Sequence, residues 1–203
     1  MADIRFRLEE DDKQEEKKQG PGEAMLEKMM ETRTILLSGE VNKELAERVV
    51  RQLLLMEAAG DDPIKVLIDS PGGDVDAGFA IFDMMRFVKP RVVTVGMGLV
   101  ASAGALILLA APKEDRFALP NSHYLIHQPL SGIRGVATEI EIHARELEKL
   151  REKLNRLISE ETGTPLEKVE KDTDRDFWMN SDEAITYGLV SKIVKNRTEL
   201  DIS

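Results

Sequence analysis

The sequence predicts an α/β domain in which helices pack on a largely parallel sheet. Short aliphatic and β-branched runs alternate with longer segments of helical periodicity, the order expected of strands joined by crossover helices. Turns that contain glycine or proline separate many of these segments. Hydrophobic residues make up 42% of the 203 residues, which is enough to form the core of a single domain.

The elements are expected in a regular order after a charged N-terminal segment. Residues 1–24 are interpreted as a flexible tail, although alternation of Ile4, Phe6 and Leu8 with arginines permits a short strand on docking. One domain is expected over residues 25–196, followed by a C-terminal tail over residues 197–203. The predicted strands cover residues 34–37, 65–69, 92–95, 117–119 and 124–126, and the predicted helices start near Ala24 and Ser102 or cover residues 42–59, 76–87 and 137–161.

The stretch from Val92 to Pro112 contains no charged residue and raises the alternative of a transmembrane helix. It opens with β-branched residues and is interrupted by Gly96, Gly98 and Gly104. These features favour a buried strand, a glycine turn and a buried helix. We therefore expect a soluble protein with no membrane partner.

Charge and cysteine content exclude several classes of function. The 38 acidic and 28 basic residues give a formal net charge of −10, so no nucleic-acid partner is expected. The chain has no cysteine, which excludes disulfides, thiolate nucleophiles and cysteine-ligated zinc. The first six residues lack the apolar run of a signal peptide, and together these features fit a cytoplasmic protein.

The segment 137–161 predicts a long charged helix with a narrow apolar seam. The seam recurs at spacings of three and four residues and consists of Ile140, Ala144, Leu147, Leu150, Leu154 and Leu157. A helix with so narrow a stripe is not expected to lie wholly on its own core. We expect it to contact a partner, and a solvated face is the alternative.

Ser102 is the candidate nucleophile, because it lies in the most apolar stretch where a strand gives way to a helix. Small neighbours permit close approach of a substrate, and a helix start offers free N–H groups to a developing anion. The alternative is a serine that only caps the helix.

The segment Ser70-Pro71-Gly72-Gly73 follows a predicted buried strand. Adjacent glycines allow backbone N–H groups to face a ligand without interference from a Cβ atom. An ordinary turn is the alternative, and no Gly-Lys-Ser/Thr follows, so it is not a phosphate-binding loop.

His127, at the end of an apolar strand, is the candidate base among three histidines. His123 and His127 could share a strand face and bind a metal, but no third ligand is evident, and His143 is expected to be solvated or in an interface. The acid that orients this histidine is expected in the segment 172–178, where aspartates are followed by aromatic residues that could bury one of them. Periodicity does not choose among its three aspartates.

The chain resembles a known family at several motifs that occur in the family's order, from about Thr32 to Val194. That family is the proteolytic subunit of the Clp protease, ClpP, a serine peptidase. The motifs are Ile35-Leu36-Leu37-Ser38-Gly39-Glu40-Val41, Ile68-Asp69-Ser70-Pro71-Gly72-Gly73, Met97-Gly98 through Ser102 and Gly104, Leu119-Pro120-Asn121-Ser122, Ile126-His127-Gln128-Pro129-Leu130, residues 137–146, and Asp172-Thr173-Asp174-Arg175-Asp176.

The resemblance implies a role for each matching residue. Ser102 matches the nucleophile, His127 the general base and Asp176 the acid that orients it. The backbone N–H groups of Gly73 and Ala103 match the oxyanion hole. Asp174 and Arg175 match positions that join two rings in the family.

The resemblance further implies the crotonase-like superhelix, with the segment 137–161 as a protruding handle helix. It implies two stacked heptameric rings that enclose the active sites and degrade unfolded polypeptides. Extended substrates would pair with strand edges through backbone hydrogen bonds. No cofactor or metal is expected in this subunit, since ATP would be used by a separate hexameric AAA+ unfoldase.

Some residues depart from the family pattern. Ala103 replaces the usual methionine, and Leu99-Val100 replaces the usual glutamine and alanine, so the substrate pocket is expected to differ. The segment 2–22 is unlike the family's N-terminal loops, which leaves the unfoldase partner less supported than the peptidase. Two alternatives remain: a non-catalytic or regulatory ring subunit, and an acyl-CoA enzyme of the crotonase superfamily with a catalytic carboxylate near the oxyanion hole.

Overall fold

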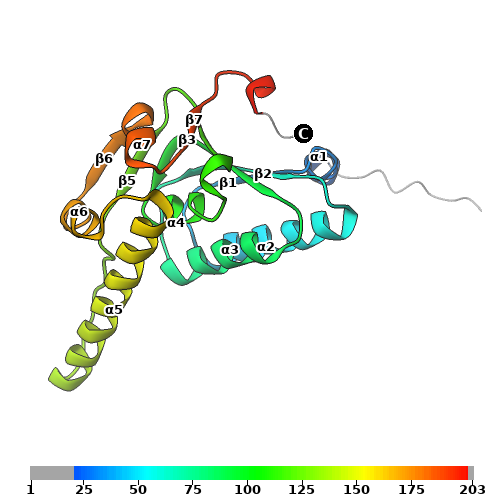
Figure 1. The fold of residues 1–203 in the computed structure, drawn as a ribbon. Coiled ribbons are helices and arrows are strands. Elements are labelled where there is room, and N and C mark those ends of the chain that lie inside the picture. Colours follow the sequence, from blue (N-terminus) through cyan, green and yellow to red (C-terminus); the bar gives the residue numbers. More distant parts are fainter. Residues whose placement is uncertain (1–20, 201–203) are drawn as a thin grey trace, which may run out of the picture.

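The structure is a computed structural model that describes residues 21–200 (Figure 1). The strands are β1 (Thr34–Ser38), β2 (Ile64–Ser70), β3 (Val92–Ala101), β4 (Arg116–Ala118), β5 (His123–Ile126), β6 (Phe177–Asn180) and β7 (Lys192–Ile193). The helices are α1 (Pro21–Glu31), α2 (Lys43–Ala59), α3 (Val75–Phe87), α4 (Ala103–Leu108), α5 (Ala137–Thr162), α6 (Leu166–Asp172) and α7 (Ser181–Tyr187). Short 3-10 turns cover Lys113–Asp115 and Arg197–Glu199. Residues 1–20 of the tail predicted over residues 1–24, with its conditional docking strand, and residues 201–203 lie outside the described part.

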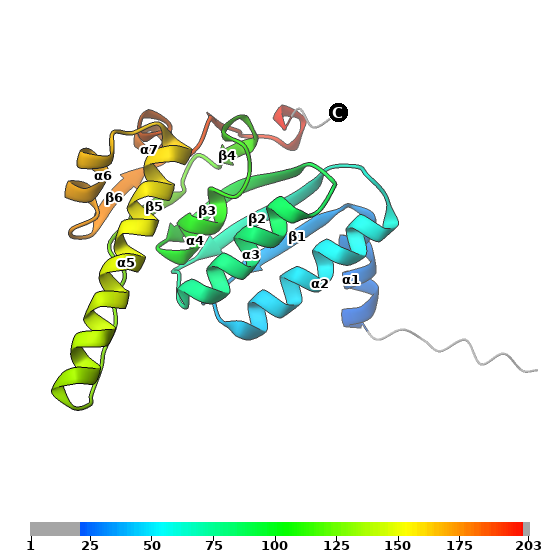
Figure 2. The ribbon, with the colours of Figure 1, turned by 60° about the horizontal axis from the view of Figure 1, so that its bottom comes forward.

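The sheet confirms the predicted α/β class with a largely parallel sheet. Its strand order is β1-β2-β3-β4-β7, with β5 paired to β3 and β6 paired to β5. The β5–β6 pair is antiparallel, and the other described pairs are parallel. Helices α2, α3 and α4 cover one face of the sheet (Figure 2), where side chains such as Leu37, Leu53, Ile68, Ile81 and Ile107 form the core.

Side-chain caps and alternating burial explain the first half of the fold. The Asn42 side chain accepts a hydrogen bond from Leu45 N–H (2.9 Å), and the Asp74 side chain accepts one from Ala77 N–H (2.7 Å). Both contacts satisfy amides that a helix start leaves without an intrahelical partner. In β2 the alternate side chains are buried, as expected of a strand that turns one face to the core. Helix α1 begins at Pro21, ahead of the expected Ala24, because proline is tolerated in the first turn of a helix.

Strand β3 is longer than predicted, and the expected glycine turn after Val95 was wrong. β3 continues to Ala101 through a bulge, because Ile68 pairs with Gly96 whereas Ser70 pairs with Val100. Gly98, with φ +56°, permits the bulge. The strand therefore continues past Gly96 and Gly98 and does not end in a turn there. Among residues 21–200, no helix is both long and apolar enough to span a bilayer.

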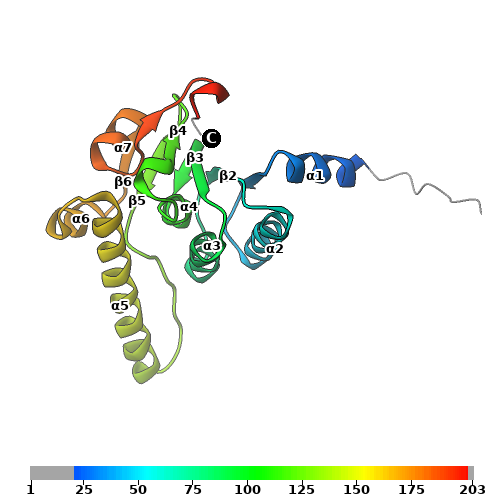
Figure 3. The same ribbon diagram turned by 45° about the vertical axis from the view of Figure 1, so that its right-hand side comes forward.

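Helix α5 projects away from the body of the molecule (Figures 1 and 3). Its C-terminal half packs Leu150, Leu154 and Leu157 against the core, whereas Ile140 and Ile142 near its N-terminal end remain exposed. The seam is therefore divided, with one half on the chain's own core and the other half uncovered.

Candidate active site

Ser102 lies between the end of β3 and the start of α4 in a strained backbone conformation. Its φ of +53° and ψ of −120° are unusual for a residue with a side chain. The Ser102 N–H donates to Leu125 O (2.9 Å), which fixes this conformation against β5. The Ser102 side chain makes no capping bond to α4, which is six residues long. The alternative of a serine that only caps the helix is therefore not supported.

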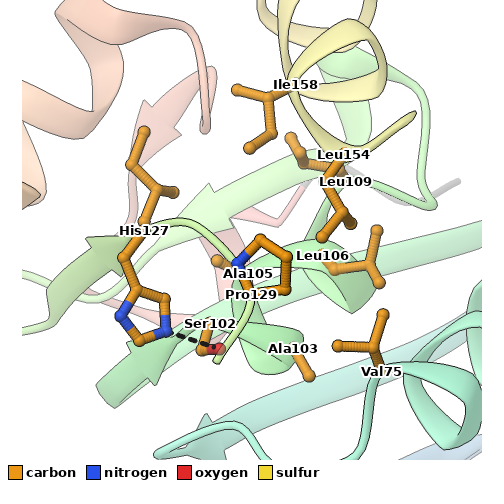
Figure 4. A pocket seen from close by; sticks show the side chains of 11 residues that line it. Val75, Ser102, Ala103, Ala105, Leu106, Leu109, His127, Pro129, Leu154 and Ile158 are labelled. Atoms are coloured by element: carbon orange, nitrogen blue, oxygen red, sulfur yellow. Dashed lines mark hydrogen bonds between the residues drawn. The ribbon is translucent and has the colours of Figure 1, made fainter. Parts of the chain in front are cut away.

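His127 lies next to Ser102 because β5 runs parallel to β3. The register pairs Ala101 with Leu125, so the residues that follow the two strands emerge at the same edge of the sheet. His127 Nε2 is 2.9 Å from Ser102 Oγ (Figure 4). The imidazole is largely buried, with 16% of its side chain exposed. The serine hydroxyl therefore has a proton acceptor within hydrogen-bond distance.

Asp176 contacts the other nitrogen of the same imidazole. The antiparallel β5–β6 pair aligns Ile126 with Phe177, which places the residue before β6 beside the residue after β5. Asp176 Oδ1 is 2.9 Å from His127 Nδ1. The carboxylate is 62% exposed in the isolated chain, so water screens this contact on one side.

The other candidate residues of this region lie outside the Ser-His-Asp contact. Asp174 and Arg175 are exposed beside Asp176, and the Asp174 carboxylate is 3.3 Å from Arg151 Nη2 on α5. His123 is exposed on β5, and His143 is exposed on α5. Within residues 21–200, no three His, Asp or Glu side chains gather closely enough to hold a metal ion.

The Gly72-Gly73 turn packs directly on Ser102 and Ala103. A Cβ atom on Gly72 would lie 2.6 Å from Ser102 Cβ and 3.0 Å from Ala103 N. The φ angles of +93° and +147° at the two glycines also favour residues without a side chain. Two hydrogen bonds between backbone groups help to hold the turn, Val41 N–H to Gly72 O and Asp74 N–H to Val41 O, and neither uses the Gly73 N–H. Gly73 and Ala103, the two predicted amide donors, thus each adjoin a residue of the Gly72–Ser102 contact in sequence.

An apolar pocket opens beside the Ser102–His127 contact (Figure 4). It is lined by Val75, Ser102, Ala103, Ala105, Leu106, Leu109, Ile126, His127, Pro129, Leu154 and Ile158. The last two come from α5. The sequence places Leu154 in a seam that is expected to contact a partner, and it does not predict that α5 lines this pocket. No carboxylate is among these lining residues, whereas the acyl-CoA alternative requires one near the amide donors.

Comparisons with known proteins agree with this geometry. The family model described as Clp protease matches residues 17–197. The "ATP-dependent Clp protease proteolytic subunit 2" of Treponema denticola is 62% identical over 194 residues, which are 95% of this chain and 97% of the relative. The "ATP-dependent Clp protease proteolytic subunit 3" of Rhizobium meliloti is 50% identical and covers 94% of this chain and 98% of its own.

A solved structure shows the same fold. A point mutant of ClpP1 from Listeria monocytogenes superposes with a TM-score of 0.82 at 52% identity, and the match covers 87% of this chain and 99% of that one. The identity is high enough for the shared fold to reflect common descent. The chain belongs to the Clp protease family.

Proposed function

We propose that this Clp family serine peptidase cleaves polypeptides with Ser102 as nucleophile, His127 as general base and Asp176 as the acid that orients the base. The observation that carries the proposal is the chain of two 2.9 Å contacts, from Ser102 Oγ to His127 Nε2 and from His127 Nδ1 to Asp176 Oδ1. This arrangement suits acyl transfer through a covalent intermediate.

The reaction proceeds in two steps. His127 Nε2 takes the Ser102 proton while Oγ forms a bond to the scissile carbonyl carbon, and the carbonyl oxygen becomes an oxyanion. The C–N bond then breaks, and His127 returns the proton to the leaving amine. His127 then takes a proton from water as the water oxygen bonds to the acyl carbon. The C–Oγ bond breaks, His127 returns the proton to Ser102 Oγ, and the carboxylic acid leaves. Asp176 stabilises the imidazolium that forms in each step.

The N–H groups of Gly73 and Ala103 are proposed to bind the oxyanion. Gly73 follows Gly72, which packs on Ser102 and Ala103, and replacing a methionine by Ala103 leaves a backbone donor unchanged. The apolar pocket beside His127 would receive the substrate side chain that precedes the cleaved bond. Because burying an unpaired charge there is costly, uncharged apolar side chains are favoured.

We further propose that the chain works in a barrel of two stacked heptameric rings in the cytoplasm. The names of the relatives describe subunits of an ATP-dependent protease. The chain has no Gly-Lys-Ser/Thr phosphate-binding loop after its glycine turn, which supports ATP use by a separate hexameric unfoldase. No cofactor is needed for the proposed chemistry. Asp174 and Arg175, exposed beside the site, are proposed to contact the opposite ring.

A hydrolysis assay on assembled rings tests the proposed function. Wild-type rings should cleave a fluorogenic peptide with an apolar residue before the cleaved bond, and Ser102→Ala rings of equal size should not. A wild-type particle that assembles but cleaves no peptide would favour the non-catalytic ring subunit. Full activity in Ser102→Ala rings would reject Ser102 as the nucleophile.

A further inference from the structure

Ser70 is a buried hydroxyl that the proposed mechanism does not use. It ends β2, and none of its surface is exposed. Its Oγ accepts a hydrogen bond from Gly72 N–H at 3.1 Å. Gly72 immediately precedes Gly73, the proposed oxyanion donor, so the hydroxyl holds the peptide next to the one that must point at the substrate.

The same serine also packs against the element that carries the second donor. A Cβ atom on Gly104 would lie 3.2 Å from Ser70 Cβ and 3.1 Å from Ser70 O. Gly104 follows Ala103 in α4, so Ser70 touches the neighbours of both donors. It contacts the turn through a hydrogen bond and α4 through close packing.

The residue before Ser70 fixes the segment that leads to the nucleophile. Asp69 Oδ1 accepts a hydrogen bond from Leu99 N–H (3.0 Å), and a Cβ atom on Gly98 would lie 2.7 Å from that oxygen. These contacts hold the bulge of β3, shortly before Ser102. The end of β2 therefore sets the geometry of the glycine turn and of the bulged strand together.

We propose that Ser70 is a positioning residue for the oxyanion hole. Its hydroxyl orients the Gly72 peptide so that the N–H groups of Gly73 and Ala103 converge on one oxygen. Ser70 lies behind the turn and acts on the transition state without touching the substrate. The inference rests on the proposed peptidase function.

Ser70→Ala removes the hydroxyl and should affect the transition state more than substrate binding. Loss of a whole oxyanion donor costs roughly 10²–10³ in kcat, so misorientation of one donor should lower kcat roughly 10–100-fold. KM should change less than about twofold, because the substrate pocket does not include Ser70. The inhibition constant of a peptide boronate, whose tetrahedral adduct places an oxygen in the oxyanion hole, should rise by about the factor lost in kcat/KM.

Ser122→Ala is the matched control. Ser122 is also a buried serine, 2% exposed, but its hydroxyl bonds to Leu119 O (2.8 Å) and the Tyr124 hydroxyl (2.9 Å), away from the turn. Its rings should keep kcat and boronate affinity within about twofold of wild type, because no donor depends on it. If Ser70→Ala rings do not assemble, Ser70→Cys is measured instead. The thiol sulfur accepts the Gly72 N–H more weakly than a hydroxyl does. Ser70→Cys should therefore show the same pattern as Ser70→Ala, with a smaller loss of kcat and of boronate affinity.

Three outcomes overturn the inference. Assembled Ser70 variants with wild-type kcat and boronate affinity would show that the hydroxyl does not position the donors. A rise in KM that accounts for the whole loss in kcat/KM would assign Ser70 to substrate binding. Equal losses in Ser122→Ala would show a general effect of removing a buried hydroxyl. By contrast, wild-type rings that neither cleave peptide nor bind the boronate would refute the proposed function itself, and this inference with it.

Discussion

The three aspartates between residues 172 and 176 have different partners in the structure. Asp172 pairs with Lys168 (2.6 Å), Asp174 with Arg151 (3.3 Å) and Asp176 with His127 (2.9 Å). Sequence periodicity could not choose among them, because the choice depends on the register between β5 and β6, two strands that lie far apart in the chain. The motif resemblance pointed to Asp176 by position, and the tertiary fold supplies the physical reason.

Asp176→Asn should lower kcat while leaving KM nearly unchanged. The amide cannot stabilise the imidazolium, and in a buried triad the corresponding change costs roughly 10⁴-fold. Because Asp176 is 62% exposed, water can partly replace its carboxylate, and we expect a loss on the order of 10²–10³-fold. Steady-state peptide hydrolysis on assembled rings measures it.

Asp172→Asn provides the control, since its carboxylate faces Lys168. Its kcat should stay within about threefold of wild type, because this carboxylate, 11% exposed, pairs with Lys168 and not with His127. A loss in Asp172→Asn as large as in Asp176→Asn would contradict the assignment of the orienting acid.

At the scale of elements, the sequence predicted the order of the first strands and helices but not the path of β3. Runs such as residues 65–69 and 42–59 carry clear periodicity, and the structure contains β2 and α2 there. The glycines at 96 and 98 suggested a turn, since glycine is common in turns. The bulge was missed because the Asp69 side chain that stabilises it makes a tertiary contact, which a local pattern does not show. Likewise, β6 depends on its pairing with β5 and has no strong alternation of its own.

The base of α5 is fixed by a buried arginine. Arg116 is 1% exposed and donates to the carbonyl oxygens of Ala111 (2.7 Å), Leu109 (3.2 Å) and Glu161 (2.8 Å), and its guanidinium also contacts the Glu161 carboxylate. Burial lowers the pKa of Arg116, which the Glu161 carboxylate opposes. These contacts join the end of α5 to the end of α4, which lines the apolar pocket.

Glu161→Gln should therefore destabilise the protein. Removing one partner of a buried ion pair costs roughly 3–5 kcal/mol. That loss should lower Tm by roughly 10 °C in a domain of this size. Differential scanning calorimetry at fixed protein concentration measures the shift.

The exposed pair of Arg51 and Glu47 on α2 serves for comparison. Glu47→Gln removes a similar charge pair at the surface, where such pairs contribute about 0–1 kcal/mol, so Tm should fall by less than about 4 °C. Equal decreases in Tm for Glu161→Gln and Glu47→Gln would show that the buried pair with Arg116 stabilises the protein no more than an exposed pair does.

Leu154 on α5 should control which side chains enter the apolar pocket. Leu154→Ala enlarges the pocket, and kcat/KM for a peptide with phenylalanine before the cleaved bond should rise relative to leucine, by roughly tenfold. Leu150→Ala alters the same helix outside the pocket lining and should leave the ratio unchanged. A ratio that moves equally in both variants would mean that α5 acts through stability and not as a pocket wall.

At the scale of the whole molecule, the isolated chain leaves apolar surface uncovered around α5. Ile140, Ile142 and Leu130 are 42%, 54% and 82% exposed. Exposed apolar side chains gathered in one region are typical of an interface. This surface fits the proposed ring assembly. The narrow seam of the helix predicted only a contact with a partner, and the family resemblance implied the rings.

Arg175→Ala should shift double rings toward single rings and reduce peptidase activity. Within the described chain, the guanidinium makes a long 3.5 Å contact to Asp174 O, so most of its donors remain available to the opposite ring. Analytical ultracentrifugation reports the ring population. Arg51→Ala, which changes an exposed arginine on α2, should leave the population unchanged. Double rings that persist fully in Arg175→Ala would remove the proposed contact.

Covalent labelling with a fluorophosphonate tests whether His127 activates Ser102, because the probe reacts with an activated serine hydroxyl. Assembled wild-type protein should gain one probe per chain, mapped by peptide mass spectrometry to Ser102. Ser102→Ala should abolish the label and His127→Ala should weaken it strongly, since the imidazole that accepts the proton is gone. Label on a different serine, or none on intact assembled rings, would contradict the assignment of Ser102 as a nucleophile activated by His127.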